Sequence, residues 1–263
     1  MLFSGVTSVT FRSLTASKVI DIARSNKLSA IEWGGDIHAP PSDLENAKLL
    51  GQLTVDAGLK VSSYGSYWRA EDMSSFKSVL SCAIALGAPL IRVWAGSTGR
   101  DCTDSYTYTK LKNNLIEAAN MAKAEGVSIA LEYHSDTLTD SLESTVCLLE
   151  DTEGSGILTY WQPPVGMSLQ ENLSAIQALS DKLANIHVFS WSATERLPLI
   201  CHENLWHDYI NELKKLDSDR YLILEFVKDD DPTQFAADAA VLKRWIGENG
   251  EVGEIGKIQG NLS

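Results

Sequence analysis

The stretch from Tyr108 to Tyr133, YTKLKNNLIEAANMAKAEGVSIALEY, contains one complete unit of the pattern that decides the fold. Apolar residues recur at spacings of three and four from Tyr108 to Glu125, which predicts an amphipathic helix. Gly126 follows at the position where a helix commonly ends. The next run, Ser128 to Tyr133, is short and apolar without strict alternation, as expected of a parallel strand that is buried on both faces.

This unit of helix and strand repeats along the whole chain of 263 residues. Parallel strands joined by right-handed crossovers form either an open doubly wound sheet or a closed barrel. No GxGxxG pattern follows the first apolar run, and eight such runs in this length fit the barrel better. We predict one (β/α)8 TIM barrel over residues 1–248 and a C-terminal tail, residues 249–263, that is loose or packed outside the barrel. The predicted strands are Gly5 to Thr10, Ser29 to Trp33, Lys60 to Tyr64, Pro89 to Trp94, Ser128 to Tyr133, Gly156 to Trp161, Ala184 to Ser190 and Tyr221 to Val227.

The charge balance of the chain is strongly acidic. Lys and Arg number 22 against 35 Asp and Glu, a net charge of −13, which argues against binding a nucleic-acid backbone or an anionic membrane surface. No stretch is apolar and long enough to cross a bilayer, and the first residues do not have the pattern of a secretory signal. The four cysteines lack CxxC spacing, so we expect reduced thiols in a cytoplasmic protein.

Two glutamates close apolar strands of the predicted barrel, at the end where barrel enzymes carry their catalytic residues. Glu132 and Glu225 each follow three apolar residues, and a carboxylate in such a place needs a cation, a hydrogen-bond network or a raised pKa. His187 and Gln162 lie on neighbouring strands. Each of the four could be structural when taken singly, but together they predict a divalent metal site. The oxygen-rich donor set favours Mn²⁺ or Mg²⁺, and Zn²⁺, Co²⁺ or Fe²⁺ are also compatible with it.

Aromatic side chains also gather at the predicted strand ends. Aromatic faces stack on the C–H faces of sugar rings, which suits a carbohydrate pocket. Alternatively, some of these rings complete the barrel core. Our candidates for substrate contacts are Trp33, His38, Trp68, Trp94 and His134, and Tyr67 and Trp161 lie at the same ends.

Six short motifs follow one another in a fixed order around the predicted barrel. They are IEWGGDIH (Ile31 to His38), IRVWAG (Ile91 to Gly96), LEYHSDTLTDS (Leu131 to Ser141), YWQP (Tyr160 to Pro163), NIHV (Asn185 to Val188) and LILEF (Leu222 to Phe226). In this order, over about Val6 to Trp245, the chain resembles the xylose isomerase-like barrel superfamily of sugar phosphate isomerases and epimerases, also labelled apurinic endonuclease family 2. The resemblance implies a xylose isomerase-like TIM barrel that isomerises or epimerises a sugar.

Members of this family hold a divalent metal with a glutamate, an aspartate, a histidine and a glutamate on strands five to eight. Carried over to this sequence, the implied ligands are Glu132, Gln162, His187 and Glu225. Gln162 departs from the pattern, because the family usually has aspartate in a similar tryptophan–acid–proline context. A neutral amide removes one negative charge, so the metal would bind more weakly or be more Lewis acidic. A degenerate site stays open as an alternative.

The resemblance also implies a mechanism. The metal binds oxygens of a ketose-like substrate and stabilises the enediolate that forms when a proton next to the carbonyl is removed. Glu132 and Glu225 are the implied catalytic pair, one removing the proton and the other returning it. His134 would contact a substrate hydroxyl, and Arg196, in the loop after the seventh strand, is a candidate for an anionic or hydroxyl contact. The implied partner is a small-molecule sugar, and association into a homo-oligomer is compatible with the family.

Other functions compete with the isomerase. A keto-sugar lyase or dehydratase begins with the same proton abstraction, so the sequence does not separate the two. The departure at Gln162 motivates a third reading, a non-catalytic sugar-binding barrel. A DNA-repair nuclease of this superfamily is disfavoured, because its multi-metal cluster is rich in histidine and this chain has five histidines and a net charge of −13.

Overall fold

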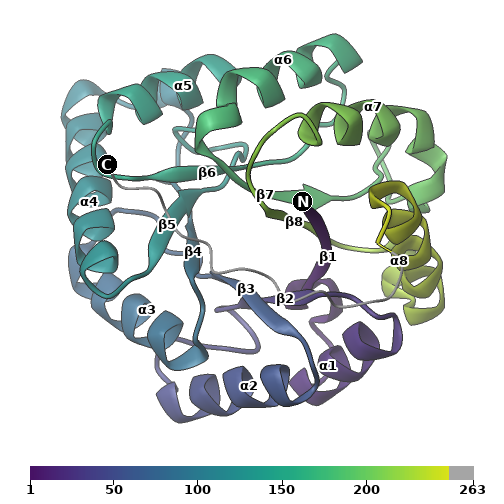
Figure 1. Ribbon diagram of the computed structural model, residues 1–263. Coiled ribbons are helices and arrows are strands. Elements are labelled where there is room, and N and C mark those ends of the chain that lie inside the picture. Colours follow the sequence, from purple (N-terminus) through teal and green to yellow (C-terminus); the bar gives the residue numbers. More distant parts are fainter. Residues whose placement is uncertain (249–263) are drawn as a thin grey trace.

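Eight parallel strands close on themselves in sequence order in the computed structural model of the chain, which describes residues 1–248 (Figure 1). The predicted barrel is therefore confirmed. The predicted tail, residues 249–263, lies outside the described residues. The strands are β1 (Leu2–Thr7), β2 (Ala30–Gly34), β3 (Lys60–Gly65), β4 (Leu90–Val93), β5 (Ser128–Leu131), β6 (Leu158–Trp161), β7 (Leu183–Val188) and β8 (Arg220–Leu224).

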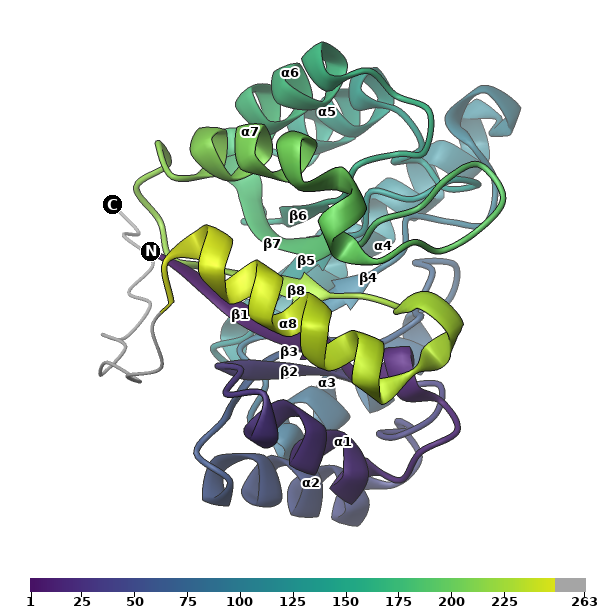
Figure 2. The ribbon, with the colours of Figure 1, turned by 90° about the vertical axis from the view of Figure 1, so that its right-hand side faces the viewer.

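The helices form a ring outside the barrel (Figures 1 and 2). Most of them begin after an Asp, Ser or Thr whose side chain accepts a hydrogen bond from a backbone N–H of the first turn, as Asp104 does before α4 and Ser168 before α6. They are α1 (Ala16–Ser25), α2 (Leu44–Asp56), α3 (Met73–Leu86), α4 (Ser105–Ala124), α5 (Leu142–Asp151), α6 (Leu169–Leu179), α7 (Glu203–Leu213) and α8 (Pro232–Ile246). Short 3-10 helices are η1 (Ser8–Phe11), η2 (Arg100–Cys102), η3 (Ser180–Lys182), η4 (Leu199–His202) and η5 (Lys228–Asp230).

The side chains of each strand alternate between the barrel interior and the layer beneath the helices. A small interior cluster is apolar apart from the hydroxyls of two tyrosines and consists of Ala30, Leu90, Ala130, Tyr160, Tyr221 and Ile223. The much larger core lies between the strands and the helices. Because the side-chain period is two, the residue two positions beyond an interior residue points inward again. This register predicts one inward-facing layer above the interior cluster, consisting of Glu32, Arg92, Glu132, Gln162 and Glu225.

None of the helices within residues 1–248 is both long enough and apolar enough to span a membrane. The strand boundaries differ from the predicted ones mainly at the first strand. The sequence predicts Gly5 to Thr10, whereas β1 ends at Thr7 and Ser8–Phe11 turn into η1. The apolar residues of this turn, Val9 and Phe11, are buried, so their hydrophobicity does not distinguish a strand from a buried 3-10 turn.

Candidate metal centre

Glu132, His187 and Glu225 each offer a donor atom within 4.8 Å of the others. They come from the carboxyl ends of β5 and β8 and from β7, and all three are buried. The three residues that the sequence pointed to for this chemistry are therefore brought together by the barrel. Gln162, at the end of β6, joins them and places its side-chain oxygen 3.0 Å from His187 Nδ1.

Three oxygens surround Nδ1 of His187. Besides Gln162 Oε1, they are Glu225 Oε2 at 3.3 Å and Glu132 Oε1 at 3.5 Å. Ligands that sit about 2.0–2.1 Å from an octahedral metal at right angles to one another are about 3.0 Å apart. The observed spacings of 3.0–3.5 Å match such a set, so the donors fit a small divalent cation.

The other ring nitrogen of His187 faces a residue that our sequence prediction of the site did not include. Glu32 Oε1, on β2, lies 3.3 Å from His187 Nε2. An ionised carboxylate only accepts, so this contact assigns the proton of a neutral ring to Nε2. Nδ1 then turns a lone pair toward three oxygen acceptors, an arrangement that a cation between them stabilises. This carboxylate–histidine pair has the form of the outer-shell contact found behind metal-bound histidines.

Glu32 is held as a carboxylate by its surroundings. Burial by itself would raise its pKa, but Arg92, His187 and a hydrogen bond from Ser63 together lower the pKa well below the ordinary value. Ser63 donates to Glu32 at 2.8 Å and the Tyr160 hydroxyl donates at 2.9 Å. The side chain is fully buried, so its role is to orient His187 rather than to meet a substrate.

Arg92 is the second residue of the centre that sequence reasoning missed. It lies on β4, 1% exposed, and forms ion pairs with Glu32 at 3.3 Å and with Glu132. Burial would lower the pKa of Arg92, but the carboxylate of Glu32 and other neighbouring groups raise it above its ordinary value. The sequence does mark both residues as unusual. Arg92 is a charged residue within an apolar strand, and Glu32 follows an apolar run as Glu132 does.

The charges of this layer do not balance within the protein. Three carboxylates, from Glu32, Glu132 and Glu225, face one guanidinium, from Arg92. With a neutral His187, two negative charges remain in a buried space. Buried charge without compensation is costly, and one divalent cation would supply the missing two positive charges.

Trp94 and His134 lie beside the centre. The Trp94 indole donates to Glu132 and stacks against the His134 ring at 4.4 Å between centroids, with an angle of 24° between the planes. The Arg69 guanidinium lies 4.0 Å from the Trp94 ring centroid. Trp94 and His134 are both half-buried.

Trp33 and Trp68 are not brought to the centre. Glu32 points into the barrel, so the next residue, Trp33, points outward, and its indole donates to Thr54 of α2 at 3.1 Å. The Trp68 indole donates to the Asp72 carbonyl at 2.9 Å and packs against Phe76. Both rings fit the alternative interpretation, in which some of the aromatic residues complete the core. The positions of Trp33 and Trp68 therefore do not support a substrate contact by either residue.

His38 and Arg196 lie away from the donor cluster as well. Nε2 of His38 bonds to the Leu14 carbonyl at 3.0 Å, and burial lowers the pKa of its imidazole. Arg196, between β7 and α7, pairs with Asp230 at 2.6 Å and lies over the Phe226 ring. Phe226 directly follows Glu225, so Arg196 belongs to the rim on that side of the barrel.

Comparison with known proteins assigns the chain to a family. The model of the xylose isomerase-like TIM barrel family matches residues 20–245. No curated protein sequence matched.

Among solved structures, the probable 3-DHS dehydratase AsbF of Bacillus anthracis is similar with a TM-score of 0.77 and 17% identity over 92% of this chain and 98% of that one. L-ribulose 3-epimerase gives 0.73 and 15% over 94% and 95%. D-psicose 3-epimerase of Clostridium cellulolyticum H10 gives 0.71 and 13% over 92% and 98%. At these identities the likeness to solved structures shows the shared fold, and the family match decides the assignment: the chain belongs to the xylose isomerase-like TIM barrel family.

Proposed function

We propose that this protein is a metal-dependent sugar isomerase or epimerase that removes and returns a proton next to a carbonyl. The observation that carries the proposal is the set of three oxygens around His187 Nδ1, in a layer that has two uncompensated negative charges. The epimerases among the similar structures support the choice of sugar chemistry.

The metal would be held by Glu132, Gln162, His187 and Glu225, with Mn²⁺ or Mg²⁺ favoured and Zn²⁺, Co²⁺ or Fe²⁺ compatible. When bound, such a cation polarises the carbonyl and hydroxyl oxygens of a sugar and so makes the neighbouring C–H acidic. Gln162 contributes an oxygen without a charge. Glu32 and Arg92 supply the fixed charges around the set, Glu32 behind His187 and Arg92 behind Glu132.

The two catalytic carboxylates differ in their freedom to move. Glu132 is fixed by donors from Arg92 and Trp94, which hold its Oε2 and leave Oε1 facing His187. Glu225 has a side chain that is 10% exposed, and its contact in this layer is with His187. We assign the removal of the substrate proton to Glu225 and the delivery of a proton to Glu132, which would be protonated at that step; exchange with solvent would then take the proton from Glu225 and restore one to Glu132 before the next turnover. Return to the neighbouring carbon gives an isomer, and return to the same carbon from the other side gives an epimer.

The substrate would lie against Trp94 and His134. A sugar places its C–H face on an aromatic ring, and the stacked pair offers such a face beside Glu132. The His134 Nδ1 atom is engaged with the Ser135 carbonyl at 2.7 Å, which orients the ring. Nε2 is then the atom of His134 that would meet a substrate hydroxyl.

A dehydratase is the second candidate. The probable 3-DHS dehydratase among the similar structures motivates it. The same proton abstraction followed by departure of a hydroxyl from the next carbon releases water instead of returning the proton. A sugar-binding barrel without turnover is the third.

The test begins with the metal content of the purified protein, measured by elemental mass spectrometry before and after chelation. The metal-loaded protein is then incubated in D₂O with a panel of ketoses, aldoses and keto acids, and proton exchange is followed by NMR. We expect about one divalent ion per chain and exchange at the carbon next to a carbonyl, which Glu225→Gln abolishes. If a substrate loses water instead, the protein is a dehydratase. If the protein holds no metal and binds sugars without proton exchange, it is a sugar-binding barrel.

A further inference from the structure

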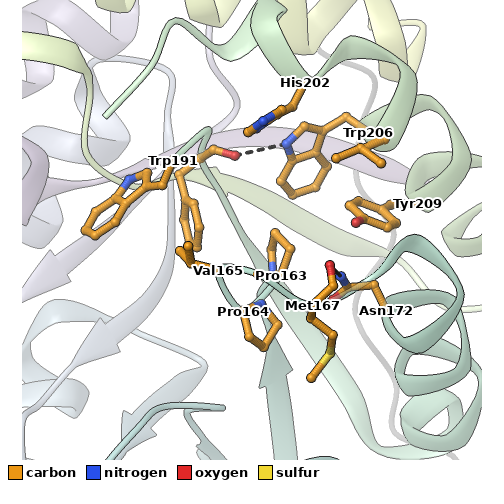
Figure 3. A pocket seen from close by; sticks show the side chains of 12 residues that line it. Pro163, Pro164, Val165, Met167, Asn172, Trp191, His202, Trp206 and Tyr209 are labelled. Atoms are coloured by element: carbon orange, nitrogen blue, oxygen red, sulfur yellow. Dashed lines mark hydrogen bonds between the residues drawn. The ribbon is translucent and has the colours of Figure 1, made fainter. Parts of the chain in front are cut away.

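The surroundings of the metal donors differ between two sides of the barrel mouth. On the side of β6 and β7, a pocket of about 150 Å³ lies outside the donor set, and the residues that line it include Pro163, Phe189 and Asn172 (Figure 3). On the side of β4, an aromatic side chain contacts a donor directly, because the Trp94 indole N–H donates to Oε2 of Glu132. The second side therefore offers a route by which residues outside the donor set act on it.

The Trp94 indole is held between groups from the two neighbouring strands. Its ring stacks with the His134 imidazole at 4.4 Å between centroids, and the Arg69 guanidinium lies 4.0 Å from its centroid. Two groups this close to one centroid would overlap if they shared a face. Arg69 follows β3 and His134 follows β5, and β4 lies between these strands, so the two groups cover opposite faces of the indole. The indole is left to act through its edge, whose N–H donates to Glu132.

Backbone pairing continues past the ends of β3 and β4 and sets Arg69 beside the indole. The Trp94 N–H donates to the Trp68 carbonyl at 2.8 Å, and the Gly96 N–H donates to the Arg69 carbonyl at 2.9 Å. The Arg69 guanidinium donates to the Gly96 carbonyl at 3.3 Å and to Ser97 Oγ at 3.4 Å. Both acceptors are neutral, so the stack on the indole is the electrostatic contact that orients this cation.

The loop that carries Arg69 is itself anchored. Ala70 has a φ of 61°, in the left-handed region that non-glycine residues seldom adopt, and its carbonyl accepts from Asn114 of α4 at 2.6 Å. Ser97 donates to Glu71 at 2.5 Å, which ties the loop after β4 to the same segment. Backbone strain of this kind persists only where surrounding contacts hold it. A firmly held segment therefore presents the guanidinium to the indole.

The consequence for Glu132 follows from its two oxygens. Arg92 and the Trp94 N–H hold Oε2, which leaves Oε1 facing His187 at 3.5 Å. A turn of the indole would remove one of the two donors to Oε2 and let the carboxylate rotate. A guanidinium on an aromatic face is attracted to the ring and so resists that turn.

We propose that Arg69 is a positioning residue: it fixes the plane of the Trp94 indole, and the indole N–H thereby keeps Glu132 aimed at the metal. The role of Glu132 in this proposal rests on the proposed function. The contacts that lead from Arg69 through Trp94 to Glu132 do not, so they are tested by measurements that need neither turnover nor, in the first case, a metal.

The link from Arg69 to the indole is tested by NMR on the metal-stripped protein, with the Trp94 indole N–H resonance assigned through its own backbone amide. A hydrogen bond to a carboxylate moves such a resonance downfield and protects it from exchange with solvent. Arg69→Met keeps an apolar stem without the cation, so the resonance should move upfield and exchange faster. Arg100→Met is the matched control, because the Arg100 guanidinium lies on another ring, 4.4 Å from the Tyr108 centroid. A resonance that stays in place in Arg69→Met, or moves equally in Arg100→Met, would overturn the proposal.

The link from the indole to Glu132 is tested by a double-variant cycle on Mn²⁺ affinity, measured by isothermal titration calorimetry. Trp94→Phe keeps a ring without the N–H and should weaken binding about tenfold, the lower end of the loss for a partner behind a metal ligand. Arg69→Met should weaken it about threefold, in keeping with one cation–π contact. In the Trp94→Phe background it should have no further effect, because the N–H that Arg69 positions is gone. An equal loss in both backgrounds would overturn the proposal. If Trp94→Phe does not fold, the indole resonance decides alone.

Turnover gives a third measurement, on any sugar that exchanges a proton. At saturating Mn²⁺, Arg69→Met should lower kcat about threefold and leave KM within about twofold of the wild-type value, because Arg69 contacts the indole and not the sugar. A raised KM with an unchanged kcat would make Arg69 a substrate contact and overturn the proposal. If the wild type binds no Mn²⁺ and exchanges no sugar, the proposed function fails, and the indole resonance still decides whether Arg69 positions Trp94.

Discussion

Glu32 Oε1 lies 3.3 Å from Nε2 of His187, on the side of the imidazole away from the nitrogen that faces the metal donors. This pair links the first half of the barrel to the ligand set. It determines which nitrogen carries the proton and therefore which nitrogen is free to bind a metal.

Replacing Glu32 by glutamine should weaken metal binding about 10–100-fold, the usual cost of losing a partner behind a metal-bound histidine. The amide can donate as well as accept, so it no longer fixes the proton of His187 on Nε2. The measurement is Mn²⁺ affinity by isothermal titration calorimetry, with circular dichroism to verify the fold. Glu195→Gln, at an exposed position, is the matched control and should bind Mn²⁺ as the wild type does. An unchanged affinity in Glu32→Gln would remove this residue from the centre.

Glu225→Gln should lower kcat about 10²–10⁴-fold on any sugar that the protein turns over, because the group that takes the substrate proton is lost while the side-chain volume is kept. Rates are compared at saturating metal, since the variant also loses one charged ligand. The melting temperature should stay close to that of the wild type. Full turnover by a metal-loaded Glu225→Gln would transfer the role of base to another group.

Gln162→Glu should tighten metal binding at least tenfold, because it adds a negative charge to the donor set at nearly the same reach. Gln162→Asp adds the same charge on a shorter side chain and reports how strongly the length matters. His187→Ala, which removes the central donor, should release the metal. Affinities are measured by competition with a chelator of known strength. If neither acidic variant changes the affinity, Gln162 is not a ligand.

Arg92→Met should lower the free energy of unfolding by about 3–5 kcal/mol, since it leaves buried carboxylates without their cation. Urea denaturation of the metal-free protein measures the loss. The double variant Arg92→Met/Glu32→Gln also removes one of the carboxylates left without a cation, so it should recover part of the lost free energy of unfolding. A loss below 1 kcal/mol in the single variant would mean that the layer tolerates the uncompensated charges.

Asp238→Asn should stabilise the protein at neutral pH. Asp238 on α8 is buried, and burial raises the pKa of its carboxyl while hydrogen bonds from the Leu199 N–H and Gln234 only partly oppose the rise. A carboxyl whose pKa is higher in the folded state than in the unfolded state loses stability as pH rises through that interval. Asparagine keeps the acceptor oxygen without the charge, so its advantage in thermal unfolding should be present at pH 7 and vanish below about pH 3.9, where aspartate is protonated even when unfolded. An advantage that is independent of pH would assign the effect to packing instead.

The barrel and the cluster of Glu132, His187 and Glu225 could be predicted because both depend on repeats and on strand ends. What the sequence did not show is which residues of a strand face inward. Glu32 and Trp33 are adjacent, and only one of them can point into the barrel. Without the register, Trp33 was a candidate for the substrate site and Glu32 was not considered, whereas the structure points Glu32 toward His187 and Trp33 toward Thr54 of α2.

The same reasoning applies to Arg92. Its position two residues beyond Leu90 places it inside the barrel, but that conclusion needs the interior layer to be known. The pocket between the loop after β6 and α7 could not be predicted either, because it depends on how that loop lies against the helix. Pro163 and Asn172 are separated by a helix start, and nothing in their spacing indicates a shared cavity.

The residues of the charged layer come from two parts of the chain with different roles. Glu32, Ser63 and Arg92 come from β2, β3 and β4, whereas Glu132, Gln162, His187 and Glu225 follow from β5 onward. The amino-terminal half thus supplies the counter-charge of Arg92 and the contact of Glu32 behind His187, and the carboxyl-terminal half supplies every metal donor. A chain cut within α4 would leave the carboxyl-terminal fragment with metal donors that Glu32 and Arg92 no longer hold, and the amino-terminal fragment with the Glu32–Arg92 ion pair but no metal donor. The centre would therefore exist only where the two halves reassociate.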